Sequence, residues 1–426
     1  MAPSLDVQAV RKHFPALDKD QVYFDNAGGS QVLREVVDSV STYLATTNVQ
    51  LGASYPIGKQ SSGKYEDGYE MAASYINAGR DEIVLGSSTT QLYRNLSMSL
   101  FEHLSPGSEI VISTMDHEAN IASWVHMASL RSVEVKWWTP SFAKGSTSNP
   151  QLDPEVLRGL MSDKTKLVAC THTGNILGTI SPIRAIADVV HSSPHALLCV
   201  DAVAYAPHRE VDVRALDADF YAFSWYKLYG PHIAMLYASP RARAVMTSLG
   251  HFFKSSSTVE EMLGLAGTSY ELLAGVPPVV RYLENLSSSI NRPSLVTAWT
   301  TIAAHEQTIQ SILLSYLANP APSHGRQVTI WGEPRADASL RVPVISFTIA
   351  GWKSKDLVLA VQDRSGGKFG FRWGAFYSNR LVSDVLGFSD IDDGVARVSL
   401  VHYNTEAEVR EFVAVLDEVL KEKTQS

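Results

Sequence analysis

The sequence predicts an α/β protein in which a large domain with a mainly parallel sheet is followed by a smaller α+β domain. Between about residue 80 and about residue 240, apolar runs typical of buried strands alternate with segments of helical spacing, which indicates a parallel sheet covered by helices on both faces. With 426 residues the chain also exceeds a single typical domain, and it shows no internal repeat.

The same patterns predict the domain boundaries. Residues 1–25 are expected to form an N-terminal arm that packs on the small domain, residues 26–275 the large domain, and residues 276–426 the small C-terminal domain. The run from Asp25 to Ser30 contains two glycines and is expected to be a loop that uses the backbone freedom of glycine. Apolar spacing then predicts a helix over 33–44.

The C-terminal part has its own helices and strands. Helical spacing predicts a helix over about 280–318 and a closing helix over 406–421, and apolar runs predict strands over 328–331 and 342–349. This mixture is typical of a small α+β layer beside a larger sheet.

Composition narrows the function classes. The formal net charge of −8 argues against nucleic acid or anionic membranes as the main partner. Two cysteines cannot build a disulfide framework, and the N-terminal segment has no cationic stretch followed by a long apolar one. No apolar run reaches membrane-spanning length, so we expect a cytoplasmic protein. No metal site is expected, because the histidines considered are scattered without paired ligand spacing: His103, His117, His172, His191, His195 and His208.

The first candidate for chemistry is Lys227, which follows the apolar run 220–223 and precedes a glycine–proline turn. A lysine at the end of a buried strand is costly to keep charged, so desolvation lowers its pKa and frees the amine to react with an aldehyde. By itself such a lysine is more often a surface residue that ends a strand.

A charge of opposite sign ends a nearby strand, because Asp201 follows the apolar run 196–200. Ligands in open α/β sheets gather at the carboxyl ends of the strands, so we expect Asp201 and Lys227 to face one crevice. Pyridoxal 5′-phosphate (PLP) needs such a pair, an amine for its aldehyde and an anion that keeps its ring nitrogen protonated.

Two further strand ends carry candidate partners of this cofactor. Ser88, Thr89 and Thr90 lie between an apolar strand and a helix that is expected to begin near Leu92, and free amides at a helix N-terminus bind phosphate. Ordinary capping of the helix by these hydroxyls is the alternative. His117 follows another apolar run, and its imidazole can stack on a flat ring or carry a proton.

These polar segments follow one another in the order of a known family. Along the chain they are Gly86-Ser-Ser-Thr-Thr-Gln91, Asp116-His-Glu-Ala-Asn120, Gly174-Asn-Ile-Leu-Gly-Thr179, Asp201-Ala-Val-Ala204 and Ser224-Trp-Tyr-Lys227. The series resembles the class V aminotransferase family of fold-type I PLP enzymes, in its cysteine desulfurase-like branch. The resemblance runs from Tyr23 to Asn404 and implies the fold-type I architecture, PLP as cofactor and a homodimer with shared active sites.

The resemblance also implies roles for single residues. Lys227 is expected to form the Schiff base with PLP, Asp201 to pair with its ring nitrogen and His117 to stack on its ring. Arg397 is expected to bind the α-carboxylate of an amino acid, a task suited to its planar fork. The expected cofactor-binding residues are Ser88, Thr89, Thr90, Asn175, Ala204, Ser224, Tyr226 and, from the neighbouring subunit, Thr268. The other expected substrate-binding residues are Asn26, Arg372 and Tyr377.

Departures from the family pattern bear on the reaction. In the desulfurases a reactive cysteine lies at about the place of Tyr377 in this chain. Cys170 and Cys199 lie in apolar strand runs and are expected to be buried and inert. Ala204 and Tyr226 stand where desulfurases carry a glutamine and a histidine. Persulfide chemistry on a protein thiol is therefore not expected.

Four stretches resemble fungal PLP enzymes that decarboxylate aspartate at its side chain and add the resulting enamine to an aldehyde, as in ustiloxin biosynthesis. They are 135–140, 204–208, 224–232 and 401–405. The resemblance implies a lyase or aldolase-like enzyme of secondary metabolism that acts at the β-carbon of an amino acid. The alternatives are a cysteine desulfurase-like carbon–sulfur lyase without a catalytic cysteine, and an aminotransferase or epimerase of the same family. A non-enzymatic scaffold is disfavoured because the chain keeps Lys227.

Overall fold

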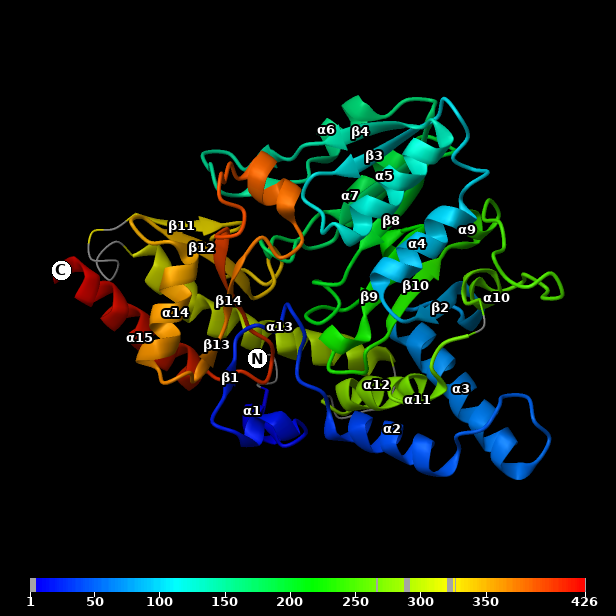
Figure 1. Cartoon of the computed structure of the whole chain (residues 1–426), viewed down its shortest axis with the longest axis horizontal. Helices are drawn as coiled ribbons and strands as arrows, with labels where there is room; N and C mark the ends of the chain where they lie inside the picture. The colour runs from blue at the N-terminus through cyan, green and yellow to red at the C-terminus, as the bar shows by residue number, and fades with distance from the viewer. Residues whose placement is uncertain (1–4, 266, 287–291, 320–324, 326, 426) are drawn as a thin grey trace.

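The large domain is built on a seven-stranded sheet with the strand order β2-β10-β9-β8-β7-β3-β4. All neighbouring strands are parallel except β10, which runs antiparallel to β2 and β9. The computed structural model describes residues 5–265, 267–286, 292–319, 325 and 327–425 (Figure 1). The strands of the large sheet are β2 (Ile83–Gly86), β3 (Glu109–Ser113), β4 (Glu134–Trp138), β7 (Thr165–Thr171), β8 (Leu197–Asp201), β9 (Phe220–Ser224) and β10 (Ala234–Ala238).

Helices cover both faces of this sheet, because successive residues of a strand point to opposite sides. In β8, Leu198 and Val200 pack into one hydrophobic core, whereas Leu197 and Cys199 pack into another. The first core contains side chains of α3 (Pro56–Tyr75), α7 (Ile183–Val190) and α12 (Val276–Asn285); the second contains side chains of α4 (Thr89–Ser99), α5 (Ala119–Arg131) and α10 (Val259–Leu263). The predicted α/β class with a mainly parallel sheet is confirmed.

The small domain is built on an antiparallel sheet with the order β11-β12-β15-β14. Its strands are β11 (Val328–Trp331), β12 (Val344–Ile349), β14 (Arg372–Gly374) and β15 (Val395–Ser399), and its helices are α14 (Ser354–Arg364) and α15 (Glu406–Gln425). The N-terminal arm joins this domain, since β1 (Val22–Tyr23) pairs in parallel with β13 (Phe369–Gly370).

One long helix, α13 (Arg292–Ala318), connects the two domains (Figure 1). Its first half places Trp299 and Ile302 in a core of the large domain, and its second half places Leu313 and Leu317 in the core of the small domain. The remaining elements are α1 (Val7–Arg11), α2 (Arg34–Thr46), α6 (Pro154–Leu160), α8 (Val213–Leu216), α9 (Pro240–Arg243), α11 (Tyr270–Leu273), β5 (Ser141–Phe142) and β6 (Pro150–Gln151).

Several sequence predictions need correction in detail. Helix α4 begins at Thr89 rather than near Leu92, because the Ser88 hydroxyl accepts a hydrogen bond from the amide of Gln91 and caps the helix. The helix expected over about 280–318 is divided into α12 and α13, and residues 287–291 between them lie outside the described residues. Within the described residues, no helix is long and apolar enough to cross a membrane.

A buried charge network holds α13 against the turn that follows β8. Glu306 on α13 is 0% exposed as a side chain and lies 2.8 Å from Nδ1 of His208 and 2.7 Å from Nη1 of Arg209. Arg209 also donates from Nη2 to the carbonyl of Arg341 in the small domain at 3.0 Å. The network therefore connects the turn that follows Asp201 to both domains.

We predict that Glu306→Ala lowers the free energy of unfolding by about 3–5 kcal/mol, because it leaves the Arg209 guanidinium buried without its anion. Urea denaturation followed by circular dichroism measures the change. The exposed neighbour Thr308→Ala serves as the control and is expected to change stability by less than about 0.5 kcal/mol. A loss below about 1 kcal/mol for Glu306→Ala would show that the network contributes no more than a surface ion pair.

Candidate active site

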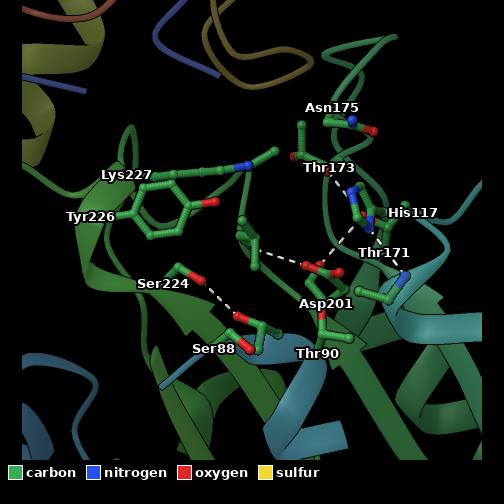
Figure 2. Close-up of a pocket in the computed structure, with 14 residues that line it drawn as sticks. Ser88, Thr90, His117, Thr171, Thr173, Asn175, Asp201, Ser224, Tyr226 and Lys227 are labelled. Carbon is green, nitrogen blue, oxygen red and sulfur yellow. Dashed lines mark hydrogen bonds between the residues drawn. The ribbon is translucent and has the colours of Figure 1, made fainter. Parts of the chain in front are cut away.

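One pocket lies at the carboxyl-terminal end of the large sheet (Figure 2). Polar residues at or just after the ends of β2, β3, β7, β8 and β9 line it. This is where a parallel sheet gathers the loops that carry function. The lining residues are Ser88, Thr89, Thr90, His117, Ala119, Thr171, Thr173, Asn175, Asp201, Val203, Ala204, Ser224, Tyr226 and Lys227.

Lys227 enters the pocket from a single 3-10 turn (Trp225–Lys227) directly after β9. Its side chain is buried, and within the described residues its amine has no hydrogen bond and no ion pair. Burial, and then the positive charge of Arg397, lower the pKa of the Lys227 amine to about 8. A large fraction of this amine is therefore neutral near pH 8 and available as a nucleophile or base.

Asp201 ends β8 on the floor of the pocket. Its Oδ1 accepts a hydrogen bond from the amide of Val203 at 2.9 Å, and no cation of the described residues forms an ion pair with it. Burial raises the pKa of Asp201 to about 6, against the opposing effects of the Val203 amide and of Lys227. A cationic group bound beside it would restore the charged carboxylate.

His117 lies between β3 and α5, on the side of the pocket opposite Lys227 (Figure 2). Its Nδ1 accepts a hydrogen bond from the amide of Ala119 at 3.0 Å, which assigns the ring proton to Nε2. Burial, followed by the charges of Lys227 and Arg397, lowers the pKa of His117 to about 4. The imidazole is therefore neutral at physiological pH.

The other end of the pocket combines a helix N-terminus with hydroxyl groups, an arrangement that can hold an anion. The N-terminus of α4 faces it, and the first helical amides of a helix have no partner within the helix. Oγ1 of Thr89 lies 2.7 Å from Oγ of Ser224, so two hydroxyls from different elements meet there. Tyr226 adds a phenol whose ring stacks on His232 with the centroids 4.6 Å apart.

These residues fit PLP. The pocket offers a buried amine without a partner, a buried carboxylate without a cation, a neutral imidazole and a helix N-terminus with hydroxyls. Oγ1 of Thr173 is buried and has no hydrogen-bond partner in the described part of the chain, so a polar atom on the pocket wall is left for a ligand.

Arg397 lies beyond this pocket, on β15 of the small domain, and is only 1% exposed. Its Nη2 forms an ion pair with Oδ1 of Asp25 at 2.8 Å, and its Nη1 donates to the carbonyl of Asn175 at 3.1 Å. The ring of Phe376 covers the guanidinium, with 3.6 Å between the ring centroid and Cζ. Burial lowers the pKa of Arg397 to about 10, so it stays a cation at neutral pH.

Asn175, the predicted neighbour of the cofactor ring and the substrate, is fixed by a loop of the small domain. Its Nδ2 donates to the carbonyl of Phe376 at 2.9 Å, and its Oδ1 accepts from the hydroxyl of Ser378 at 2.8 Å. Tyr377, between these two contacts, is 75% exposed and its ring centroid lies 5.5 Å from that of His117. Tyr377 therefore borders the pocket from outside without lining it.

Several predicted site residues do not line this pocket: Asn26, Thr268, Arg372, Tyr377 and Arg397. Asn26 is buried, and its amide group is engaged in hydrogen bonds to neighbouring backbone and side chains. Thr268 lies in the segment before α11, away from the pocket of its own chain.

The structure also adds residues that the sequence analysis missed. Ala119, Thr171, Thr173 and Val203 line the pocket. For the two threonines a signal existed, because the polar run 171–175 begins at the last residue of strand β7, just as Asp201 is the last residue of β8.

Comparisons with known proteins show the family and the fold of the chain. A family model described as aminotransferase class-V matches residues 22–412. Aminotransferase-like protein FGM3 of Gibberella zeae is 50% identical over 98% of this chain and 99% of that protein. Cysteine desulfurase-like protein ustD of Aspergillus flavus is 40% identical over 99% of this chain and 92% of that protein. The apo structure of the cysteine desulfurase of Thermococcus onnurineus NA1 matches with a TM-score of 0.82 and 22% identity, over 99% of this chain and all of that one, which shows the fold.

We predict that reductive methylation of Lys227 in the cofactor-free protein follows a pH midpoint near about 8, below the ordinary lysine value of 10.5. Mass spectrometry of the Lys227 peptide over a pH series measures it. Arg397→Gln is expected to raise the midpoint, because it removes a nearby cation that disfavours the charged amine. The matched control Arg281→Gln removes an exposed arginine that pairs with Asp67 and should leave the midpoint unchanged. A wild-type midpoint near 10.5 would contradict the desolvated amine.

Proposed function

The chain belongs to the class V aminotransferase family and is a PLP-dependent enzyme, and from this membership we propose that it removes the β-carboxyl group of an aspartate-like amino acid and joins the β-carbon to an aldehyde. In this reaction the bond between the β-carbon and the carboxylate carbon breaks, CO2 leaves, and the electron pair stays on the β-carbon. That pair forms the bond to the aldehyde carbon, and the aldehyde oxygen takes up one proton. The product is a γ-hydroxy α-amino acid of secondary metabolism.

The observation that carries this proposal is the lack of an accessible thiol. Cys170 and Cys199, the only cysteines of the chain, are free and fully buried in strands of the large sheet. Burial raises the pKa of both thiols well above the ordinary value, so neither supplies a thiolate. A desulfurase that forms a persulfide needs such a nucleophile near the substrate. The relative of Aspergillus flavus is nevertheless named cysteine desulfurase-like, and desulfurization breaks a bond at the β-carbon of an amino acid, which favours a reaction at this carbon with a different leaving group.

PLP, when bound, supplies an electron sink for negative charge that develops on the substrate beside the amino group. We propose that Lys227 binds its aldehyde carbon, that Asp201 keeps its ring nitrogen protonated and that His117 stacks on its ring. The residues proposed to hold the phosphate and the ring oxygen are Ser88, Thr89, Thr90, Asn175, Ser224, Tyr226 and the nearby Ala204.

The remaining steps fall to the protein's own groups. The amine of Lys227, of which about half is neutral near pH 8, is proposed to take the proton from the α-carbon. Arg397 is proposed to fix the α-carboxylate through a charge-assisted pair. Phe376 and Tyr377 present aromatic surface where the desulfurases carry a thiol, which suits an organic acceptor such as an aldehyde.

We also propose a cytoplasmic homodimer in which Thr268 contributes to the phosphate site of the partner subunit. The position of Thr268 outside its own pocket supports this arrangement. The loop before α10 exposes Phe252 and Phe253, which are 99% and 69% exposed. Burial of these rings against a second copy would stabilise the dimer.

We predict that Lys227→Ala abolishes the visible absorbance of lysine-linked PLP and lowers turnover by about 10²–10⁴-fold, because it removes both the covalent attachment and the base. Absorbance spectra and product assays measure the two effects. Tyr226→Phe, which keeps the neighbouring ring, is the control and should retain the lysine-linked spectrum. An unchanged spectrum in Lys227→Ala would exclude Lys227 as the attachment site.

We predict that the PLP-loaded protein releases CO2 from L-aspartate and forms a new carbon–carbon bond when an aldehyde is added, while L-cysteine gives no sulfide. Gas capture, sulfide assay and mass spectrometry measure the products. With L-aspartate alone, protonation of the β-carbon gives alanine. Sulfide from L-cysteine without CO2 from L-aspartate would replace the proposal with a carbon–sulfur lyase that uses no protein persulfide.

A further inference from the structure

Two arginines of the small domain lie directly opposite each other on neighbouring strands. In the antiparallel pair β14–β15, Arg372 is the register partner of Arg397. Like charges at directly opposed positions are destabilising, so this pair requires an anion. Lys227 adds a third cation whose pKa both arginines lower.

Asp25 supplies that anion. One of its carboxylate oxygens lies 2.8 Å from Nη2 of Arg397, and the other lies 2.5 Å from Nε of Arg372. The backbone fixes Asp25 in this place, because it forms an isolated parallel bridge with Ser399 two residues beyond Arg397. The amide of Ser399 also donates to the carbonyl of Phe24 at 2.7 Å. The N-terminal arm therefore inserts one carboxylate between the two guanidinium groups.

The surroundings enclose the guanidinium of Arg397, whereas the side chain of Arg372 is 52% exposed. Phe376 lies over both guanidinium groups, with its ring centroid 3.6 Å from Cζ of Arg397 and 5.3 Å from Cζ of Arg372. A Cβ atom on Gly28 would lie 2.5 Å from Nη2 of Arg372 and 3.1 Å from Oδ2 of Asp25. Gly28 has no positive φ, so the loop does not use the backbone freedom of glycine at this position, which corrects the expectation for this loop; a Cβ atom here would instead displace the end of the Arg372 side chain and crowd Asp25.

The hydrogen bonds of Arg397 leave some of its N–H donors free, but its positive charge is already paired with Asp25, so a second carboxylate competes with Asp25 for that charge. Nη1 donates to the carbonyl of Asn175 and Nη2 to Asp25, while the buried Nε has no partner within the described residues. Arg372 and Arg397 share the single carboxylate of Asp25, so these three side chains together keep one positive charge. An incoming carboxylate can be neutralised by Arg397 if Asp25 releases Nη2 and stays on Arg372.

We propose that Asp25 is an internal carboxylate that competes with the α-carboxylate of the substrate for Arg397. In this arrangement Arg372 is a positioning residue that acts through Asp25 and does not contact the substrate. Because Arg372 gives Asp25 a second partner, it lowers the cost of releasing Arg397. The inference rests on the proposed role of Arg397 in binding the α-carboxylate, and it replaces the expectation that Arg372 binds substrate directly.

The test measures binding of propionate, a carboxylate without an amino group, to the PLP-loaded protein by calorimetry. Propionamide, which has the same shape without the charge, is the matched ligand control. Asp25→Asn is expected to bind propionate about tenfold more tightly than the wild type, because one charged competitor for Arg397 is gone. Asp18→Asn removes an exposed carboxylate from the same arm and should change nothing. Equal or weaker propionate binding in Asp25→Asn would overturn the inference.

A double-mutant cycle tests the role of Arg372. Arg372→Gln keeps the pair of Asp25 with Arg397, so it should fold normally, and it is expected to bind propionate more weakly than the wild type. The double variant Asp25→Asn/Arg372→Gln should bind as tightly as Asp25→Asn alone. If Arg372→Gln weakens binding equally in both backgrounds, Arg372 contacts the ligand and its positioning role is wrong.

The failure of the proposed function gives a different result from the failure of this inference. Arg397→Gln should abolish propionate binding both in the wild-type and in the Asp25→Asn background. If Arg397→Gln binds propionate normally, the α-carboxylate site lies elsewhere and the premise is wrong. If Arg397→Gln loses binding while Asp25→Asn gains none, the premise holds and only the competition by Asp25 is excluded.

Discussion

The removal of a few charges from water governs the architecture around the pocket. Lys227 and Arg397 are both buried, and they come from different domains. Arg397 lowers the pKa of Lys227, and both cations lower the pKa of His117. Two carboxylates favour the charged forms of these cations: Asp201 and Asp25 both raise the pKa of Lys227, and Asp25 also raises the pKa of Arg397. A buried ion without a partner is costly, so the pairing of these four groups decides which of them stay charged. The pKa of the Lys227 amine therefore depends on its burial and on all of these charged groups together.

The relative position of the two domains is therefore part of the site. The amine of Lys227 follows β9 of the large sheet, whereas the guanidinium of Arg397 comes from β15 of the small sheet. Three connections fix the distance between them: helix α13 runs through both cores, Glu306 connects α13 to the turn after Asp201, and the N-terminal arm pairs with the small domain. Such connections reduce the freedom of the domains to shift, and correct placement of reacting groups depends on small displacements.

The sequence could predict the pocket but not the charge cluster beside it. Lys227, Asp201 and His117 each lie at the end of an apolar strand or shortly after it. Parallel strands bring their carboxyl ends to one edge of the sheet, so the pattern of apolar and polar residues along the chain is enough to predict that these side chains meet. The contact of Asp25 with Arg397 joins residues far apart in the chain through a register that only the folded sheet defines. The reason for Gly28 likewise depends on the position of a distant guanidinium, and no local signal carries it.

The loop that contains Phe376 and Tyr377, at the place where desulfurases carry a thiol, is held in one conformation beside the pocket. Phe376 and Tyr377 both have positive φ values, 50° and 61°, a conformation that costs free energy for residues other than glycine and persists only where contacts enforce it. Those contacts exist: the carbonyl of Phe376 accepts from Asn175, that of Tyr377 accepts from the amide of Glu118 at 2.8 Å, and Phe376 stacks on Arg397. A segment held at these points has little freedom to carry a nucleophile between substrate and acceptor. It is suited instead to orient Asn175 and Arg397.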